Sequence, residues 1–163
     1  MNKNLTDTIN LVSHLTPRRL WNFGAITGSY ILSKWTGRNL HRGMPAAISF
    51  EPTTSCNLRC PECPSGLRSF TRPTGMLDPQ FFKKVIDEIH NDLIYLVFYF
   101  QGEPYLNTSF LELVKYATSK NIYTATSTNA HYLNDDNAKK TVESGLDRLI
   151  ISIDGTTQET YES

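Results

Sequence analysis

Residues 93–100 read LIYLVFYF, an apolar run without a single charged side chain. A strand with one solvent-facing side alternates apolar and polar residues, whereas a parallel strand covered on both faces is apolar throughout. Upstream, Asp78-Pro79 predicts a helix start, because Asp caps free N–H groups and Pro loses no hydrogen bond at the first helical position. The apolar face of that helix consists of Phe81, Phe82, Val85, Ile86 and Ile89. A buried strand beside an amphipathic helix favours an α/β fold.

Strand and helix patterns alternate from Ala46 to the last residue. The predicted strands cover residues 46–51, 93–100, 122–126 and 148–153. Ser109 and Thr156 each precede a Glu by three residues, which predicts a capping box at the start of two further helices. Asn134 caps another helix, which stops near Gly145. This alternation predicts a parallel sheet whose right-handed crossovers place the helices on its outer side.

Residues 1–45 differ in character, so we divide the chain into an N-terminal helical extension (1–45) and a core domain (46–163). Apolar residues recur at helical spacing in the extension, but Pro17 and three glycines interrupt the pattern. We expect the extension to pack against the core domain. The alternative is a helix that docks on a membrane surface or a partner, which its basic residues favour and two glycines in its apolar face disfavour.

Charge and hydropathy exclude several classes of protein. Sixteen basic residues balance sixteen acidic ones, so nothing indicates a nucleic-acid partner. The polar start MNKNLTDTIN lacks the apolar segment of a secretory signal, and no apolar run reaches the roughly 20 residues that a transmembrane helix needs. Clustered thiols without a secretory signal are typical of the reducing cytoplasm, which is the expected location.

All three cysteines of the chain, Cys56, Cys60 and Cys63, fall in the segment CNLRCPEC. Soft thiolates select iron–sulfur clusters or zinc. Three thiolates hold three irons of a four-iron cubane and leave one iron open to an outside ligand, whereas structural zinc needs a fourth protein ligand. The zinc candidates His41 and His131 lack finger-like spacing to the cysteines. The pattern favours a cluster, with zinc and inert thiols as the alternatives.

Polar and turn-forming residues follow each of the four predicted strands. They are the cysteine segment, then Gln101-Gly102-Glu103-Pro104, then Ser127-Thr128-Asn129, and finally Ser152 with Asp154-Gly155. The carboxyl ends of parallel strands meet at one rim, which is where α/β folds bind their ligands. We therefore expect these four loops to form one site. The aromatic residues Tyr95, Phe98 and Phe100 are interpreted as core.

CNLRCPEC resembles the CxxxCxxC signature of the radical S-adenosylmethionine (radical SAM) superfamily. The resemblance extends from about Ala46 to the last residue and includes a GEP segment at Gly102 and an SIDG segment at Ser152. CNLRCPECPSG combined with FQGEP is most similar to the SPASM-type branch, whose members often modify peptides or proteins. The cysteine motif is specific by itself, and the other segments gain weight from their order.

The resemblance implies a chemistry. Cys56, Cys60 and Cys63 would hold a 4Fe–4S cluster whose open iron chelates the amino and carboxylate groups of S-adenosylmethionine. Reductive cleavage would give a 5′-deoxyadenosyl radical that abstracts hydrogen from a substrate, in this branch a peptide or protein. A reductant such as flavodoxin or ferredoxin would supply the electron. No side chain is assigned as catalytic, because the cofactors carry the radical chemistry.

The resemblance also assigns seven residues to cofactor contacts. They are Gly102, Glu103, Pro104, Ser127, Asn129, Ser152 and Asp154. The first three match the segment near the cofactor's ammonium group, where a carboxylate suits the positive charge. The next two match contacts to the methionine carboxylate or ribose, and the last two match contacts to the ribose. Ordinary turn and cap chemistry is the alternative explanation.

The chain departs from the family pattern in three ways. Glu62 replaces an aromatic residue before the third cysteine, and Gln101 replaces a glycine before GEP. Only about four of the usual six β/α units are found, so we expect a partial (β/α) TIM-like barrel from the N-terminal part of a longer protein.

This sheet would have an unpaired edge, and we expect the isolated chain to be poorly stable with little turnover. The alternative functions are a non-catalytic iron–sulfur electron carrier, a zinc-stabilised interaction module and a degenerate fragment.

Overall fold

A computed structural model describes residues 3–153, 155, 157, 159 and 160. Its centre is one sheet of four parallel strands in the order β1-β2-β3-β4. The strands are β1 Ala47–Ser49, β2 Tyr95–Val97, β3 Tyr123–Thr128 and β4 Arg148–Ile151. Leu96 pairs with Ile48 on one side and Thr124 on the other, which fixes the register of the first three strands. The predicted parallel α/β sheet is confirmed.

Three strands are shorter than predicted and one is longer. After β1, Pro52 and the cysteine loop take the chain away from β2, although Phe50 N–H still donates to Val97 O at 2.9 Å. β3 continues to Thr128, because its last residues pair with β4 and its buried threonine hydroxyls find acceptors. The prediction that this strand ends at 126 is therefore wrong.

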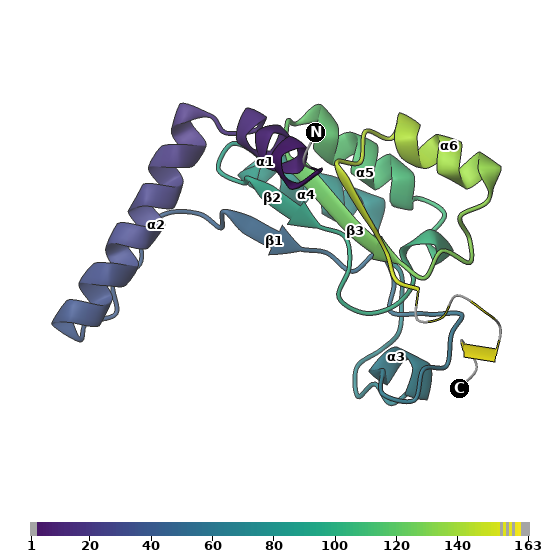
Figure 1. Cartoon of the computed structure of the whole chain (residues 1–163). Helices are drawn as coiled ribbons and strands as arrows, with labels where there is room; N and C mark the ends of the chain where they lie inside the picture. The colour runs from purple at the N-terminus through teal and green to yellow at the C-terminus, as the bar shows by residue number, and fades with distance from the viewer. Residues whose placement is uncertain (1–2, 154, 156, 158, 161–163) are drawn as a thin grey trace.

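Three helices follow the strands: α4 Pro79–Ile89, α5 Phe110–Ser119 and α6 Asp135–Glu143. Two short helices were not predicted, α3 Pro64–Leu67 and the 3-10 helix η1 Pro104–Leu106. Figure 1 shows α4, α5 and α6 grouped on one side of the sheet. The core lies between β2 and the helices α4 and α5. Its fully buried apolar residues include Phe82, Ile86, Leu93, Leu96, Phe98, Leu113, Val114 and Ala117.

The predicted caps of α4 and α6 are confirmed. Asp78 and Asn134 each accept a hydrogen bond from the backbone N–H three residues later, at 2.7 and 2.9 Å. The capping box predicted at Ser109 is wrong, because Ser109 stands at the cap position but its side chain makes no cap hydrogen bond. Asn107 Oδ1 instead accepts from Ser109 N–H at 2.9 Å. The capping box predicted at Thr156 lies outside the described residues.

Before the sheet, the chain forms α1 Lys3–Ser13 and α2 Pro17–Thr36. α1 lies at the amino ends of the strands, and α3 lies at the opposite end (Figure 1). The Tyr123 hydroxyl at the start of β3 donates to Asp7, and Asn10 Nδ2 donates to Asp147 just before β4, at 2.8 Å. These bonds attach α1 to the sheet.

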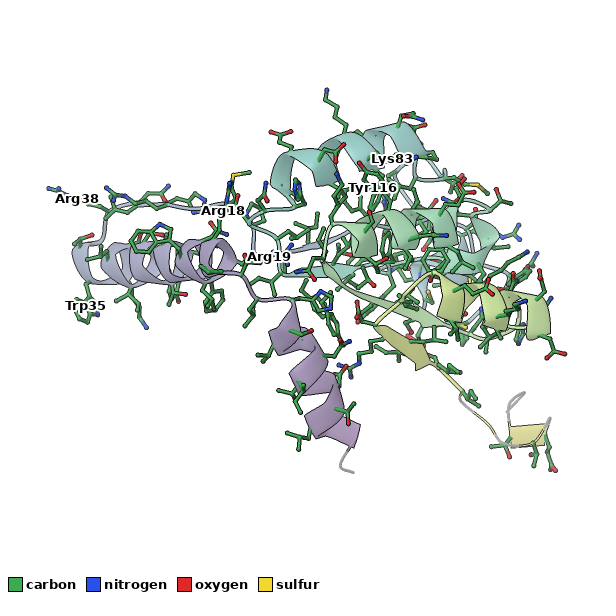
Figure 2. The ribbon with its side chains drawn as sticks, turned by 90° about the horizontal axis from the view of Figure 1, so that it is seen from above. Arg18, Arg19, Trp35, Arg38, Lys83 and Tyr116 are labelled. Carbon is green, nitrogen blue, oxygen red and sulfur yellow. The ribbon has the colours of Figure 1, made fainter. Side chains whose placement is uncertain are left out.

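α2 projects away from the sheet, and only its first turns reach the core (Figure 1). Arg18 forms an ion pair with Asp92 at 2.8 Å. The buried Arg19 guanidinium donates to the carbonyl oxygens of His14, His90, Lys120 and Asn121. In Figure 2 both arginines lie near the sheet, whereas Trp35 lies at the far end of α2.

The extension thus contacts the core through α1 and the start of α2, and the division at residues 1–45 and 46–163 stays a proposal. Among the described helices, none has both the length and the apolar content to cross a bilayer.

Candidate functional site

The cysteine loop leaves β1 at the carboxyl end of the sheet and enters α3. All three thiols are free, with Cys60 exposed and Cys56 and Cys63 half-buried. A Cβ at Gly66 would stand 2.5 Å from both the N and the O of Cys60. Only glycine therefore lets α3 pack so closely against the loop. The sequence reasoning missed this role of Gly66, although the segment PSG directly after the third cysteine was a signal for it.

Two of the thiols have shifted pKa values in opposite directions. Burial raises the pKa of the Cys56 thiol. The backbone N–H of Gly66 lowers the pKa of the Cys63 thiol and so favours its thiolate. The thiolate is the form that binds metal.

The possible metal ligands of the described residues do not converge on one point. Among the described residues, no three His, Cys, Asp or Glu side chains are placed to hold one metal ion. A cubane binds each thiolate through a different iron, so it needs three thiols on one loop rather than three that meet at one point. His131 Nδ1 lies 2.9 Å from Asn57 Nδ2, which engages one of the two histidines considered for zinc.

The loop after β2 packs against the cysteine loop. Gly102 has φ +79°, and a Cβ there would overlap Thr53 O and stand 2.8 Å from Ser55 O. Its N–H donates to Ser65 Oγ at 3.1 Å, and the Ser65 hydroxyl donates to Gln101 Oε1 at 2.9 Å. The glycine thus allows two protein backbones to approach each other, and the departure at Gln101 supplies an acceptor beside α3.

Glu103 is buried, with 2% of its surface exposed, and it connects β2 to the end of β3. Its Oε1 accepts from the Thr128 hydroxyl at 2.7 Å and from Tyr105 N–H at 3.3 Å. Its Oε2 accepts from Asn129 N–H at 3.0 Å. The carboxylate that is predicted to face the cofactor's ammonium group therefore joins the loop after β2 to the end of β3.

The end of β3 reaches the cysteine loop through Asn129. Its Nδ2 donates to Asn57 Oδ1 at 2.9 Å and lies 3.9 Å from Cys56 Sγ. Ser127 belongs to β3 rather than to the loop after it, and its hydroxyl lies 3.2 Å from that of Ser152. Residues from β3 and from the end of β4 are thus brought beside the first cysteine.

These elements enclose a pocket of about 220 Å³. Its lining residues are Cys56, Leu58, Cys60, Tyr99, Phe100, Gly102, Glu103, Ser127, Thr128, Asn129 and Ser152. Two of the three cysteines and five of the seven predicted contact residues belong to this list. The four loops expected to form one site do meet at one rim.

The remaining predicted residues are not part of this list. Cys63 is not part of the pocket wall, and the buried Pro104 starts η1. Asp154 lies outside the described residues. Phe98 is core as predicted, but the same prediction for Phe100 is wrong, since Phe100 is 75% exposed and lines the pocket. The apolar run 93–100 does not distinguish Phe98 from Phe100, because β2 ends at Val97, before the last residues of the run.

A sequence model of the radical SAM superfamily matches residues 50–163. The chain belongs to the radical SAM superfamily. Members of this superfamily use a 4Fe–4S cluster and S-adenosylmethionine. The three free thiols on one loop, beside a pocket with a buried carboxylate, fit these two cofactors.

Curated relatives share the sequence of this region. The chain is 34% identical over 130 residues to the AdoMet-dependent heme synthase of Oleidesulfovibrio alaskensis, covering 77% of this chain and 32% of that protein. It is 33% identical over 119 residues to the mycofactocin maturase MftC of Mycobacterium ulcerans, covering 73% and 32%. It is 31% identical over 114 residues to the PqqA peptide cyclase of Rhodopseudomonas palustris, covering 70% and 30%. The chain thus spans about a third of the length of these relatives.

The resemblance to the SPASM-type branch is confirmed, since MftC and the PqqA peptide cyclase are of that type. The fold resembles that of BtrN, solved in complex with AdoMet and 2-DOIA, with a TM-score of 0.61 at 22% identity over 74% of this chain and 52% of that one. The partial-barrel prediction agrees with this likeness.

Proposed function

We propose that this chain forms the cofactor-binding part of a radical SAM enzyme, with Cys56, Cys60 and Cys63 as the ligands of a 4Fe–4S cluster. The observation that carries the proposal is the 220 Å³ pocket, whose wall joins two of these cysteines to polar residues after β2, β3 and β4. When bound, the cluster and S-adenosylmethionine supply a 5′-deoxyadenosyl radical that abstracts hydrogen from a substrate.

The protein side chains hold and orient the ligand. The Glu103 side chain is buried in the wall of the pocket, where attraction between a carboxylate and a ligand ammonium group is stronger than in bulk water. The exposed hydroxyls of Ser127 and Ser152 offer a donor and an acceptor to a sugar or carboxylate. Tyr99 and Phe100 contribute aromatic rings to one side of the pocket. The proposed set of cofactor contacts is completed by Gly102, Pro104, Asn129 and Asp154.

Iron content tests the ligand assignment. Anaerobic reconstitution should load about four irons per chain, and Cys60→Ala should lose most of them. Arg59→Ala, in the same loop but without a thiol, should keep its iron. Retention of one tightly bound zinc in place of iron would refute the cluster and favour the zinc-stabilised module.

Release of 5′-deoxyadenosine tests the enzymatic part of the proposal. The reduced, iron-loaded protein should cleave S-adenosylmethionine, and the Cys60→Ala variant should not. A fully assembled cluster without any cleavage would favour the electron carrier.

We further propose a peptide or protein substrate, a flavodoxin or ferredoxin as reductant, and a cytoplasmic location. The name of the PqqA peptide cyclase supports a peptide substrate. The name of the AdoMet-dependent heme synthase does not refer to a peptide, so the substrate class needs a test. Deuterium should pass into 5′-deoxyadenosine from a deuterated peptide fraction of a cell extract. Transfer only from the small-molecule fraction would exclude a peptide substrate.

A further inference from the structure

The helix α2 is polar on its buried side. Asn22 and Ser29 are buried, with 5% and 6% exposure. Asn22 Oδ1 accepts from Met44 N–H and its Nδ2 donates to Met44 O, both at 2.8 Å. Ser33 Oγ donates to Leu40 O at 2.7 Å and accepts from Leu40 N–H at 2.9 Å. The chain after α2 thus returns along the helix and satisfies its polar side chains.

The outward side of α2 is apolar. Trp21 and Trp35 are each 81% exposed, Leu20 and Leu32 are 54% and 52% exposed, and Ile31 is 42% exposed. At about 100° per residue, these five residues fall within an arc of about 120°, which we call the α2 stripe. This polarity is the reverse of an ordinary surface helix, which turns its apolar side inward.

The sequence suggested that Gly24 and Gly28 interrupt the helical pattern, but in the structure they do not interrupt the helix. α2 is continuous from Pro17 to Thr36, and nothing lies within 4 Å of where a Cβ of Gly24 or Gly28 would stand. Both glycines lie on the same arc as the α2 stripe, so the surface between the residues of the stripe is not covered at these two positions.

The charged residues of the segment that contains the α2 stripe all have one sign. From Thr8 to Phe50 the sequence contains no Asp or Glu. Lys34, Arg38 and Arg42 are exposed, and none of them takes part in an ion pair within the described part of the chain. Figure 2 shows Arg38 and Trp35 at the free end of α2, on opposite sides of the helix. The positive charge therefore concentrates at the end that is farthest from the sheet.

We propose that α2 docks on an anionic lipid bilayer, with the α2 stripe in the headgroup region. Exposed aromatic and aliphatic residues beside Lys and Arg, without acidic residues, are the composition of helices that lie in a membrane interface. Trp21 and Trp35 are separated by about 21 Å along the axis, and indole rings are stable at headgroup depth. α2 projects away from the sheet (Figure 1), and the residues of the stripe are exposed from Leu20 to Trp35. Arg38 and Arg42 would act through the surface potential within about a Debye length of 8–10 Å.

A second copy of the chain fits the stripe less well. A symmetric pair would place the same surface of both copies together. Lys34, Arg38 and Arg42 of each copy would then find no opposite charge on this segment of the partner copy, because the segment contains no acidic residue. An anionic surface, in contrast, attracts each of these cations.

Tryptophan fluorescence reports the environment of the α2 stripe, because Trp21 and Trp35 are the only two tryptophans of the chain. We expect blue-shifted emission, and quenching by brominated lipid, when the 163-residue chain meets vesicles of phosphatidylcholine and phosphatidylglycerol. Pure phosphatidylcholine should give a much weaker shift, and high salt should reverse the binding. This outcome does not depend on the proposed radical chemistry.

Cosedimentation with the same vesicles tests the residues. Trp35→Ala should lower the partition coefficient roughly tenfold or more. Replacing Lys34, Arg38 and Arg42 with Gln should lower it by about fivefold for each charge. The matched controls are Val142→Ala, equally exposed on α6, and Lys139→Gln, and neither should change binding. Circular dichroism verifies that each variant remains folded.

Three outcomes would overturn the proposal. The first is equal binding to neutral and anionic vesicles. The second is a concentration-dependent dimer, seen by light scattering, that alone shifts the emission. The third is no spectral change with any vesicle, which would leave the stripe to a protein partner.

Discussion

At the residue scale, the site depends on two positions where two backbone segments lie so close together that only glycine fits. Gly102 and Gly66 both lie where a Cβ would meet the backbone of the cysteine loop. In the family pattern, Gly102 belongs to the GEP segment near the cofactor. In the structure, Gly102 lies against the backbone of the cysteine loop. The glycine allows contact between two loops of the protein, and the loop contact is what places Glu103 beside the pocket.

Gly102→Ala tests this contact. Alanine would be strained at φ +79°, and its Cβ would meet Thr53 O and Ser55 O. We expect the free energy of unfolding to fall by roughly 2–4 kcal/mol, since the strain and the backbone shift add up. Urea denaturation measures it. Gly75→Ala is the control, because nothing lies within 4 Å of the added Cβ, and its effect should stay within about 0.5 kcal/mol. Equal effects of the two substitutions would contradict the close-contact explanation.

Glu103→Gln tests the carboxylate that joins β2 to β3. Both oxygens of Glu103 accept hydrogen bonds, from Thr128 and Tyr105 on one side and Asn129 on the other. The amide NH₂ of Gln would face a donor on one of these sides, which costs about 1–3 kcal/mol of stability. Thermal unfolding of the metal-free chain measures the loss. The exposed Glu112→Gln should have almost no effect, and similar losses in both variants would count against a special role for Glu103.

At the element scale, β3 attaches α1 at its first residue and contributes to the candidate site at its last. β3 begins with Tyr123, which holds α1, and ends with Thr128, which holds Glu103. The sequence predicted the strands and the caps of α4 and α6, because apolar runs and Asp or Asn caps are local signals. It did not predict the short helices α3 and η1, nor the true end of β3, which depends on hydrogen-bond partners far away in the sequence.

Tyr123 gives the attachment of α1 a pH dependence. Burial and the bond to Asp7 raise the pKa of Tyr123 well above its usual value. The folded state therefore keeps the phenol proton above pH 10, where the unfolded chain loses it. The stabilisation is fully present below pH 10 and falls by about 1.4 kcal/mol for each pH unit above it, until the folded pKa is reached.

Tyr123→Phe removes both this dependence and the hydrogen bond to Asp7. We expect a loss of about 1.5–3 kcal/mol at neutral pH, the usual worth of a hydrogen bond to a charged group. The difference between the two proteins should shrink between pH 10 and pH 12, as measured by urea denaturation. Tyr132→Phe serves as the control. A constant difference across this range would contradict the raised pKa.

At the scale of the whole molecule, the pocket collects residues from segments that are distant in the sequence. The alternation of strands and helices predicted that their loops would meet at one rim, and they do. The outward apolar side of α2 could not be predicted in the same way. Helical spacing shows that an apolar face exists, but which side is buried depends on where Asn22 and Ser33 find hydrogen-bond partners.

A ligand that fills this pocket should stabilise the whole sheet. The pocket wall includes residues that follow β1, β2 and β4 as well as the end of β3, so unfolding any strand would destroy the site. At a concentration of a hundred times its Kd, S-adenosylmethionine should stabilise the iron-loaded chain by about 2.7 kcal/mol. Calorimetry under anaerobic conditions should show the melting temperature rising with ligand concentration. The double variant Ser127→Ala/Ser152→Ala should need more ligand for the same rise, because two hydroxyls of the wall are lost. An unchanged dose dependence in that variant would contradict a contact between the ligand and these two hydroxyls.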